Sequence, residues 1–299
     1  MADTPAMRRL AAFAVLLLAF VVPAGAAPYQ LAPYKDELFA YPRILEEADG
    51  GAYLEVEYSR PRDLYARDTE RGLKVKPEYV DLSPVMEDLA VRIDGRTVKT
   101  YAVGKQSGAK AIVVFIHGMK TGRATGMDDW IHGGNFNRIK NLMARNDGLY
   151  LSPSFADFGA KGAAEMKGLV LHFALQSPGA PVVLACGSLG ARICWRLMSD
   201  PAVGPLLAGL ILFDPVMEKA DAQAVLRRVP PLPILVTGSR EDIVVGWRGQ
   251  RGLFQAIRKA APAYPIRYVL FSAGTHGLSL RMTDWRTTLN WMFAAWRPG

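Results

Sequence analysis

The second half of this chain alternates short apolar runs with helical stretches, which limits the folds available to it. The apolar runs are rich in β-branched, aliphatic and aromatic residues and span residues 112–116, 149–152, 182–185, 210–213, 234–236 and 267–271. Helical patterns separate or follow them at residues 136–144, 160–175, 189–198, 220–229, 252–260 and 282–296. Solid apolar runs are typical of strands covered on both faces. We therefore predict an α/β fold, with a mostly parallel central sheet and helices on both faces.

The chain before residue 111 has a different character. Residues 28–52 form an arm with scattered aromatic residues, and residues 53–59 alternate as in a strand. Residues 60–84 are rich in mixed charge and proline, which favours a long surface excursion. Two further strand-like runs, 89–93 and 96–103, flank Asp94-Gly95, a pair typical of a hairpin turn. We expect an N-terminal arm with antiparallel strands over residues 27–110 and an α/β core over residues 111–299.

The first 26 residues have the pattern of a secretory signal peptide. Arg8 and Arg9 precede an apolar run over residues 10–22, and the small residues Ala24-Gly25-Ala26 resemble a cleavage site. The run is short for a bilayer crossing. We therefore expect export with cleavage, to the periplasm or outside the cell, and no stable membrane span afterwards. An uncleaved membrane anchor is the alternative.

Charge and cysteine content argue against several classes of partner. The net charge is +8, but the basic residues are spread out and do not alternate with aromatic ones, so we expect no nucleic-acid partner. The two cysteines, Cys186 and Cys194, form neither a disulfide framework nor a metal signature, and we expect buried free thiols. No His/Asp cluster has metal-ligand spacing, and no metal or organic cofactor is implied. The sequence carries no signal of oligomeric state.

Polar residues follow the apolar runs directly. Ligands of parallel sheets bind beyond the carboxyl ends of the strands, so these positions are candidates for chemistry: His117, Ser188, Asp214, Asp242 and His276. Ser188 stands at the apex of a small-residue turn between a strand and a helix, which lifts its hydroxyl out of the core. A serine that only caps the following helix is the alternative.

These positions together resemble the α/β-hydrolase fold, of the serine esterase or lipase type, over residues 53–296. The motifs are Val-Val-Phe-Ile-His-Gly at residues 113–118, the turn around Ser188, Gly-Ser-Arg-Glu-Asp ending at Asp242, and Gly-Thr-His-Gly around His276. Cys186 replaces the first glycine of the family's Gly-x-Ser-x-Gly pattern. The resemblance implies one domain over residues 27–299. Few residues separate Asp214 from the helix at Ala220, so we expect little or no cap.

The resemblance also assigns roles. It implies Ser188 as nucleophile, His276 as general base and Asp242 as the acid that orients the histidine. Asp214 is the alternative acid, since some relatives place the acid one strand earlier. The backbone N–H groups of Met119 and Leu189 are the implied oxyanion hole.

The loop over residues 119–134 lies beside the predicted pocket. Its Trp130 and His132 are candidates for a substrate wall, a packed surface loop being the alternative. The sequence thus predicts an exported serine hydrolase that cleaves a small-molecule carboxylic ester through an acyl-enzyme. Thioesters, amides and acyl transfer remain open within the same chemistry. A non-catalytic binding protein of the same fold is the alternative, which the cysteine at position 186 favours.

Overall fold

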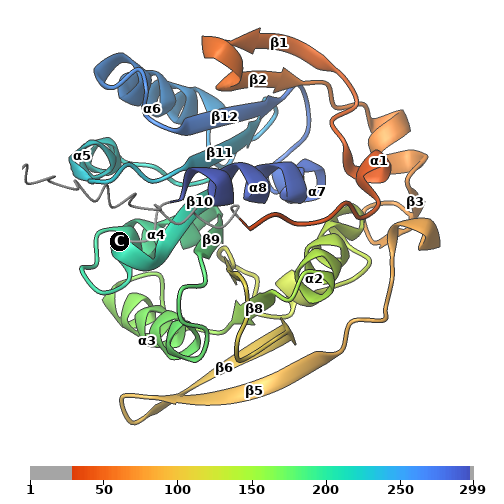
Figure 1. Cartoon of the computed structure of the whole chain (residues 1–299). Coiled ribbons are helices and arrows are strands. Elements are labelled where there is room, and N and C mark those ends of the chain that lie inside the picture. The colour runs from red at the N-terminus through yellow and green to blue at the C-terminus, as the bar shows by residue number, and fades with distance from the viewer. Residues whose placement is uncertain (1–28, 297–299) are drawn as a thin grey trace, which may run out of the picture.

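A ten-stranded sheet runs through residues 29–296, the part of the chain that the computed structural model describes (Figure 1). Its strands lie in the order β1 (Ile44–Ala48), β2 (Tyr53–Val56), β12 (Ile266–Phe271), β11 (Ile234–Ser239), β10 (Leu207–Phe213), β9 (Val182–Gly187), β7 (Ile112–Ile116), β8 (Leu149–Pro153), β6 (Arg96–Gly104) and β5 (Met86–Ile93). Neighbours from β2 to β8 are parallel, whereas β1, β6 and β5 pair antiparallel. The predicted mostly parallel sheet is confirmed.

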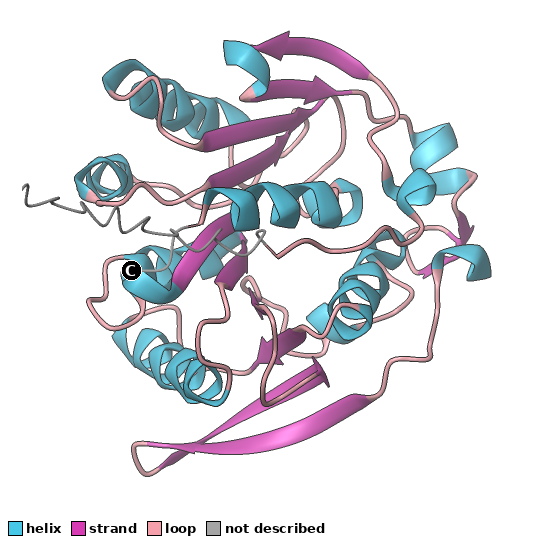
Figure 2. Cartoon of the chain, viewed as in Figure 1, coloured by secondary structure: helices cyan, strands magenta, loops and turns pink. Residues whose placement is uncertain are grey.

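Helices cover both faces of the sheet, as Figure 2 shows. One hydrophobic core includes side chains of α3 (Ala160–Gln176), α4 (Ala191–Met198), α5 (Lys219–Arg227) and α6 (Trp247–Ala260). The other includes α2 (Asn135–Arg145), α7 (Leu278–Met282) and α8 (Trp285–Ala295). Successive strand residues point to opposite faces: Val114 belongs to the first core, and Val113 and Phe115 to the second. This double burial explains the solid apolar runs.

The chain reverses its direction across the sheet between β7 and β9, which are neighbours. From β7 it passes through α2 to β8 on one side, and from β9 through α4 to β10 on the other. Such a switch point leaves a crevice at the carboxyl ends of the two strands. His117 and Ser188, which follow these strands, therefore lie at its rim.

The N-terminal segment contributes both edges of the sheet. The hairpin of β5 and β6 forms one edge, as predicted around Asp94-Gly95, and β1 with β2 forms the other. Two features differ from the prediction. The strand β1 lies within the expected arm, and β2 pairs parallel, not antiparallel, with β12. Its partner comes from the far end of the chain, which the local pattern of residues 53–59 does not reveal.

The excursion over residues 60–84 is partly buried, contrary to the prediction of a surface loop. It contains a π-helical turn (Pro61–Tyr65) and a hairpin of β3 (Asp68–Glu70) and β4 (Lys74–Val75). Asp68 forms a buried ion pair with Arg281 of α7 (2.5 Å), and Val75 donates its N–H to the Trp130 carbonyl. These long-range contacts hold the excursion against the loop that precedes α2.

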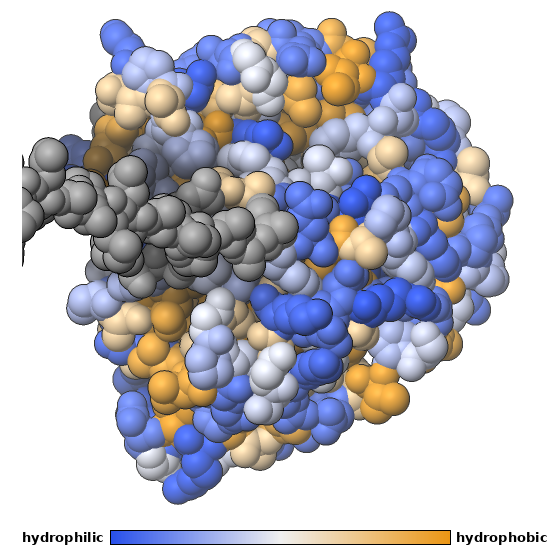
Figure 3. All heavy atoms as spheres, in the orientation of Figure 1, coloured by the Kyte–Doolittle hydropathy of each residue, from blue (hydrophilic) through white to orange (hydrophobic). Residues whose placement is uncertain are grey.

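The last predicted helix, 282–296, corresponds to α8, and the short helix α7 precedes it. Helix α7 ends at Met282 and α8 begins at Trp285, with Asp284 accepting the backbone N–H of Thr287 as the cap of α8. None of the helices in residues 29–296 combines the length and apolar character that crossing a membrane needs. On the face drawn in Figure 3, hydrophilic residues prevail and hydrophobic ones are scattered among them. The predicted signal peptide lies outside the described residues.

Candidate active site

Ser188 occupies a strained turn between β9 and α4. Its φ of 48° is in the left-handed region, which costs energy for a residue with a side chain. Position 190 requires glycine for a steric reason. A Cβ there would lie 2.7 Å from the carbonyl oxygens of both Ile116 and His117. The helix start is thus pressed against the end of β7. This turn fixes the direction of the Ser188 hydroxyl.

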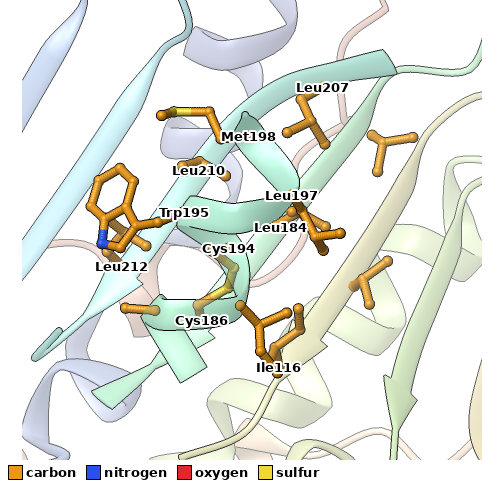
Figure 4. Close-up of a cluster of buried hydrophobic side chains, with 14 of the residues drawn as sticks. Ile116, Leu184, Cys186, Cys194, Trp195, Leu197, Met198, Leu207, Leu210 and Leu212 are labelled. Atoms are coloured by element: carbon orange, nitrogen blue, oxygen red, sulfur yellow. A yellow bond between two sulfur atoms is a disulfide. The ribbon is translucent and has the colours of Figure 1, made fainter. Parts of the chain in front are cut away.

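Cys186 and Cys194 form a disulfide that bridges this turn (Figure 4). Their Cα atoms are 6.6 Å apart, within the range of about 4.4–6.8 Å that disulfides span. The expectation of free thiols is therefore wrong, although both residues are buried as expected. Because α4 starts directly after the turn and packs back on the sheet, it brings Cys194 beside the end of β9. The cysteine that replaces the family's glycine thus ties strand to helix.

The three side chains predicted as a triad lie in one hydrogen-bonded row. His276 Nε2 is 3.0 Å from Ser188 Oγ, and His276 Nδ1 is 2.7 Å from Asp242 Oδ2. A carboxylate only accepts hydrogen bonds, so Nδ1–H donates to Asp242 and Nε2 is free to accept the serine proton. The arrangement can move a proton from the serine hydroxyl to the imidazole.

Asp242 is held in place by its own loop. Its side chain is fully buried, and Oδ1 accepts the backbone N–H groups of Val244 (2.8 Å) and Val245 (2.9 Å). Oδ2 is thereby left to face His276. Charge-assisted bonds of this kind are the stronger class, and they keep the carboxylate oriented.

Asp214, the alternative acid, contacts the turn after His276. Its Oδ2 accepts the Gly277 N–H at 2.9 Å and the Ser279 hydroxyl at 2.6 Å. Within the described residues no hydrogen bond joins Asp214 to the imidazole itself. Burial raises the pKa of Asp214 to about 6. Asp242 therefore bonds the imidazole of His276, whereas Asp214 bonds the backbone of the turn that follows it.

Asp214, Asp242 and His276 also offer ligand atoms within 4.8 Å of one another, close enough to hold a cation. These three residues were expected at one site as a base and two alternative acids, but their spacing in the sequence is not that of a metal-ligand motif. Both imidazole nitrogens already bond Asp242 and Ser188. A cation would have to displace at least one of these bonds.

The peptide between Gly118 and Met119 is fixed by two side chains. His117 Nδ1 and Thr121 Oγ1 each donate to the Gly118 carbonyl at 2.9 Å. In a trans peptide the N–H points away from the carbonyl, so anchoring this oxygen also sets the direction of the Met119 N–H. Gly118 lies close to the nucleophile turn, since a Cβ on it would be 3.1 Å from Ser188 Cβ.

Leu189 lies on the other side of the serine. It is the second residue of the helical segment Ser188–Gly190, where backbone N–H groups lack partners within the helix. The structure thus brings both predicted oxyanion residues, Met119 and Leu189, next to Ser188.

A cavity of about 200 Å³ opens at Ser188. Its walls are largely apolar and include Phe115, Met119, Phe213 and Leu280, with His132 also on the wall. Burial, with the positive charge of Arg281, lowers the pKa of His132 to about 4, so this imidazole is neutral at neutral pH. Trp130 lies outside the cavity, with its ring over the Lys74 ammonium. The structure therefore brings one of the two candidate wall residues to the site. A larger cavity of about 750 Å³ between α3, α4 and α5 contains none of the three triad residues.

Thr121 and Glu241 were not singled out from the sequence. Glu241 accepts the Gly274 N–H at 3.0 Å and pairs with Arg60 at 2.6 Å, so it holds the loop that leads to His276. The sequence around these residues does not indicate their contacts. The partners of Glu241 are distant in the sequence, and the contact of Thr121 depends on the exact geometry of its turn. A hydroxyl shortly after His-Gly was the only clue to Thr121.

Comparison with known proteins supports the fold. The Pyrococcus furiosus esterase Pf2001 has a solved structure with a TM-score of 0.54 at 14% identity, over 75% of this chain and 94% of that one. A proposed dienelactone hydrolase from Klebsiella pneumoniae gives a TM-score of 0.51 at 14% identity, over 72% and 100%. No protein-family model and no curated protein matches this sequence. The chain has the α/β-hydrolase fold.

Proposed function

We propose that this chain is a serine hydrolase that cleaves a carboxylic ester through an acyl-enzyme on Ser188. The hydrogen-bonded row from Ser188 through His276 to Asp242, at 3.0 and 2.7 Å, carries the proposal. A serine hydroxyl keeps its proton at neutral pH and needs a base within reach to become a nucleophile. The imidazole is such a base, with an acid behind it.

The reaction proceeds by two acyl transfers. Ser188 Oγ attacks the ester carbonyl carbon while its proton passes to His276 Nε2, and the carbonyl oxygen becomes an oxyanion facing the N–H groups of Met119 and Leu189. The bond to the alcohol oxygen then breaks, and the imidazolium gives its proton to that oxygen. Water, deprotonated by His276, attacks the carbonyl carbon of the acyl-serine. The bond from that carbon to Ser188 Oγ then breaks, the imidazolium returns the proton to Oγ, and the carboxylic acid leaves.

The dimensions of the cavity favour a small acyl group. Its volume of about 200 Å³ is below the roughly 300–1,000 Å³ of pockets for drug-sized ligands. Only residues 214–218 separate β10 from α5, which leaves no room for a large cap there. The structural neighbours include an esterase, which supports the ester class. Thioesters and amides, and acyl transfer to an acceptor other than water, use the same groups.

We further propose that the protein acts outside the cytosol after removal of residues 1–26. The disulfide between Cys186 and Cys194 supports this, because disulfides persist mainly in oxidising compartments. Fractionation of the producing cells and the N-terminal mass of the recovered protein test both parts.

A fluorophosphonate probe tests the proposed activity. We expect wild type to be labelled and to hydrolyse p-nitrophenyl butyrate, and Ser188→Ala to lose both properties. Ser199→Ala is the matched control, since Ser199 is exposed at the end of α4. A folded wild type that is neither labelled nor active would favour the non-catalytic binding protein.

A further inference from the structure

A second cavity, of about 240 Å³, adjoins the first at three shared residues, His132, His276 and Gly277. Its other walls come from the excursion after β2 and from the turn around His276, including Tyr58, Leu64, Gly72 and Thr275. The catalytic imidazole proposed above thus borders both cavities. In ester cleavage the leaving alcohol must reach this imidazole to be protonated, so a second cavity that borders the imidazole is placed to hold that alcohol.

The two cavities differ in chemistry. The one at Ser188 is walled by Phe115, Phe213 and Leu280. Tyr58 and Thr275 line the second, and within residues 29–296 the hydroxyl of neither takes part in a hydrogen bond. The ring nitrogens of His132 are likewise without a hydrogen bond to any described residue. These groups can donate to and accept from a ligand.

The charged groups at the second cavity are already neutralised. Arg281 donates through Nε to the Asp63 carbonyl and through both terminal nitrogens to Asp68. Arg60 pairs with Glu241 at 2.6 Å. A ligand there meets hydroxyl and neutral imidazole groups with no unpaired charge, so the cavity suits a neutral molecule with hydrogen-bonding groups.

We propose that this second cavity is the alcohol subsite, and that the preferred substrates are esters of a short acyl group with a small, neutral, hydroxylated alcohol. The inference rests on the proposed ester hydrolysis at Ser188. In the acylation step the C–O bond to such an alcohol breaks, the Ser188–acyl bond has formed, and the proton from Ser188 passes through His276 to the leaving oxygen. The remaining hydroxyls of the alcohol bond Tyr58 and Thr275.

A matched pair of substrates tests this subsite. Glycerol 1-monobutyrate and propyl butyrate share the acyl group and the three-carbon alcohol and differ only in two hydroxyls. We expect wild type to have the higher kcat/KM for the glycerol ester. Tyr58→Phe and Thr275→Val should each lower the ratio of the two kcat/KM values by roughly three- to tenfold, the effect of one hydrogen bond, with little change for propyl butyrate.

Leu280→Ala is the control, because Leu280 lines only the Ser188 cavity. It should change the preferred acyl length and leave the ratio between the two alcohols unchanged. An active wild type with equal kcat/KM for both esters, or a ratio that neither hydroxyl variant alters, overturns the subsite. A preference for butyrylcholine overturns its neutral character. A wild type that hydrolyses no ester and is not labelled by fluorophosphonate instead refutes the proposed function itself. Labelling of each variant shows that its site is folded.

Discussion

Asp214 Oδ2 accepts the backbone N–H of Gly277 at 2.9 Å, directly after the histidine of the proposed triad. A carboxylate from β10 therefore holds the backbone, while Asp242 from the next strand holds the ring. Two acidic side chains thus contact different atoms of the same turn. Their different contacts predict different consequences of removing each charge.

Asp242→Asn should lower kcat by roughly 10³–10⁴-fold, because the amide can no longer stabilise the imidazolium or enforce the reactive tautomer. Asp214→Asn retains an oxygen that can accept the Gly277 N–H, so we expect a loss of tenfold or less. Steady-state kinetics of both variants with p-nitrophenyl butyrate compare them. A larger loss of kcat in Asp214→Asn than in Asp242→Asn would make Asp214 the orienting acid.

Asp214 should also give the fold a pH dependence. Burial raises its pKa from 3.8 to about 6, so the folded chain retains a proton that the unfolded chain loses as pH rises above about 4. As pH rises between these two pKa values, the free energy of unfolding should fall by at most about 3 kcal/mol, and at higher pH it should level off. Denaturant unfolding of wild type and Asp214→Asn across this range measures it. Equal slopes for both proteins would contradict the assignment.

Thr121→Val should lower kcat several-fold and leave KM nearly unchanged. The lost hydroxyl no longer fixes the Gly118 carbonyl, so the Met119 N–H is less well directed at the developing oxyanion. Loss of a whole oxyanion donor costs about 3 kcal/mol, and this indirect change should cost less. Thr125→Val is the control, because Thr125 lines the same cavity without contacting that carbonyl. Equal effects of both substitutions would refute the positioning role.

Reduction of the disulfide should destabilise the protein by about 2–4 kcal/mol, since the bond restricts the unfolded chain. Unfolding by denaturant with and without a thiol reductant measures this difference. If an alkylating agent modified both cysteines of wild type without prior reduction, this would show that the bond does not form.

A chelator should leave esterase activity unchanged. The proposed mechanism uses Asp242 and His276 as a hydrogen-bonded pair, although they and Asp214 are close enough to hold a cation. Activity lost with chelator and restored by a divalent metal would favour metal-dependent hydrolysis. Labelling of Ser188 by fluorophosphonate, measured in parallel, separates metal catalysis from loss of fold.

Much of the architecture follows from local sequence. The runs that became β7, β9, β10, β11 and β12 are solidly apolar because both faces are covered, and polar residues mark their ends. A position within a few residues after such a run was enough to nominate Ser188, Asp214, Asp242 and His276. The choice of Asp242 rather than Asp214 as the orienting acid needed the additional resemblance to the fold family, because both residues follow such runs.

Contacts between distant segments had no comparable signal. The pairing of Cys186 with Cys194 depends on how α4 packs back on the sheet, not on spacing. The pair of Asp68 with Arg281 joins residues 213 positions apart. This contact converts a proline-rich excursion into one wall of the second cavity, and no pattern within residues 60–84 indicates it.

The parallel pairing of β2 with β12 bears on how the protein folds. The strand that leads to His276, β12, lies between β2, from the first part of the described chain, and β11, the strand that precedes it in the sequence. Pairings of such long sequence separation form slowly. We therefore expect a nascent polypeptide to have no hydrolytic power before β12 has been synthesised and has paired with β2.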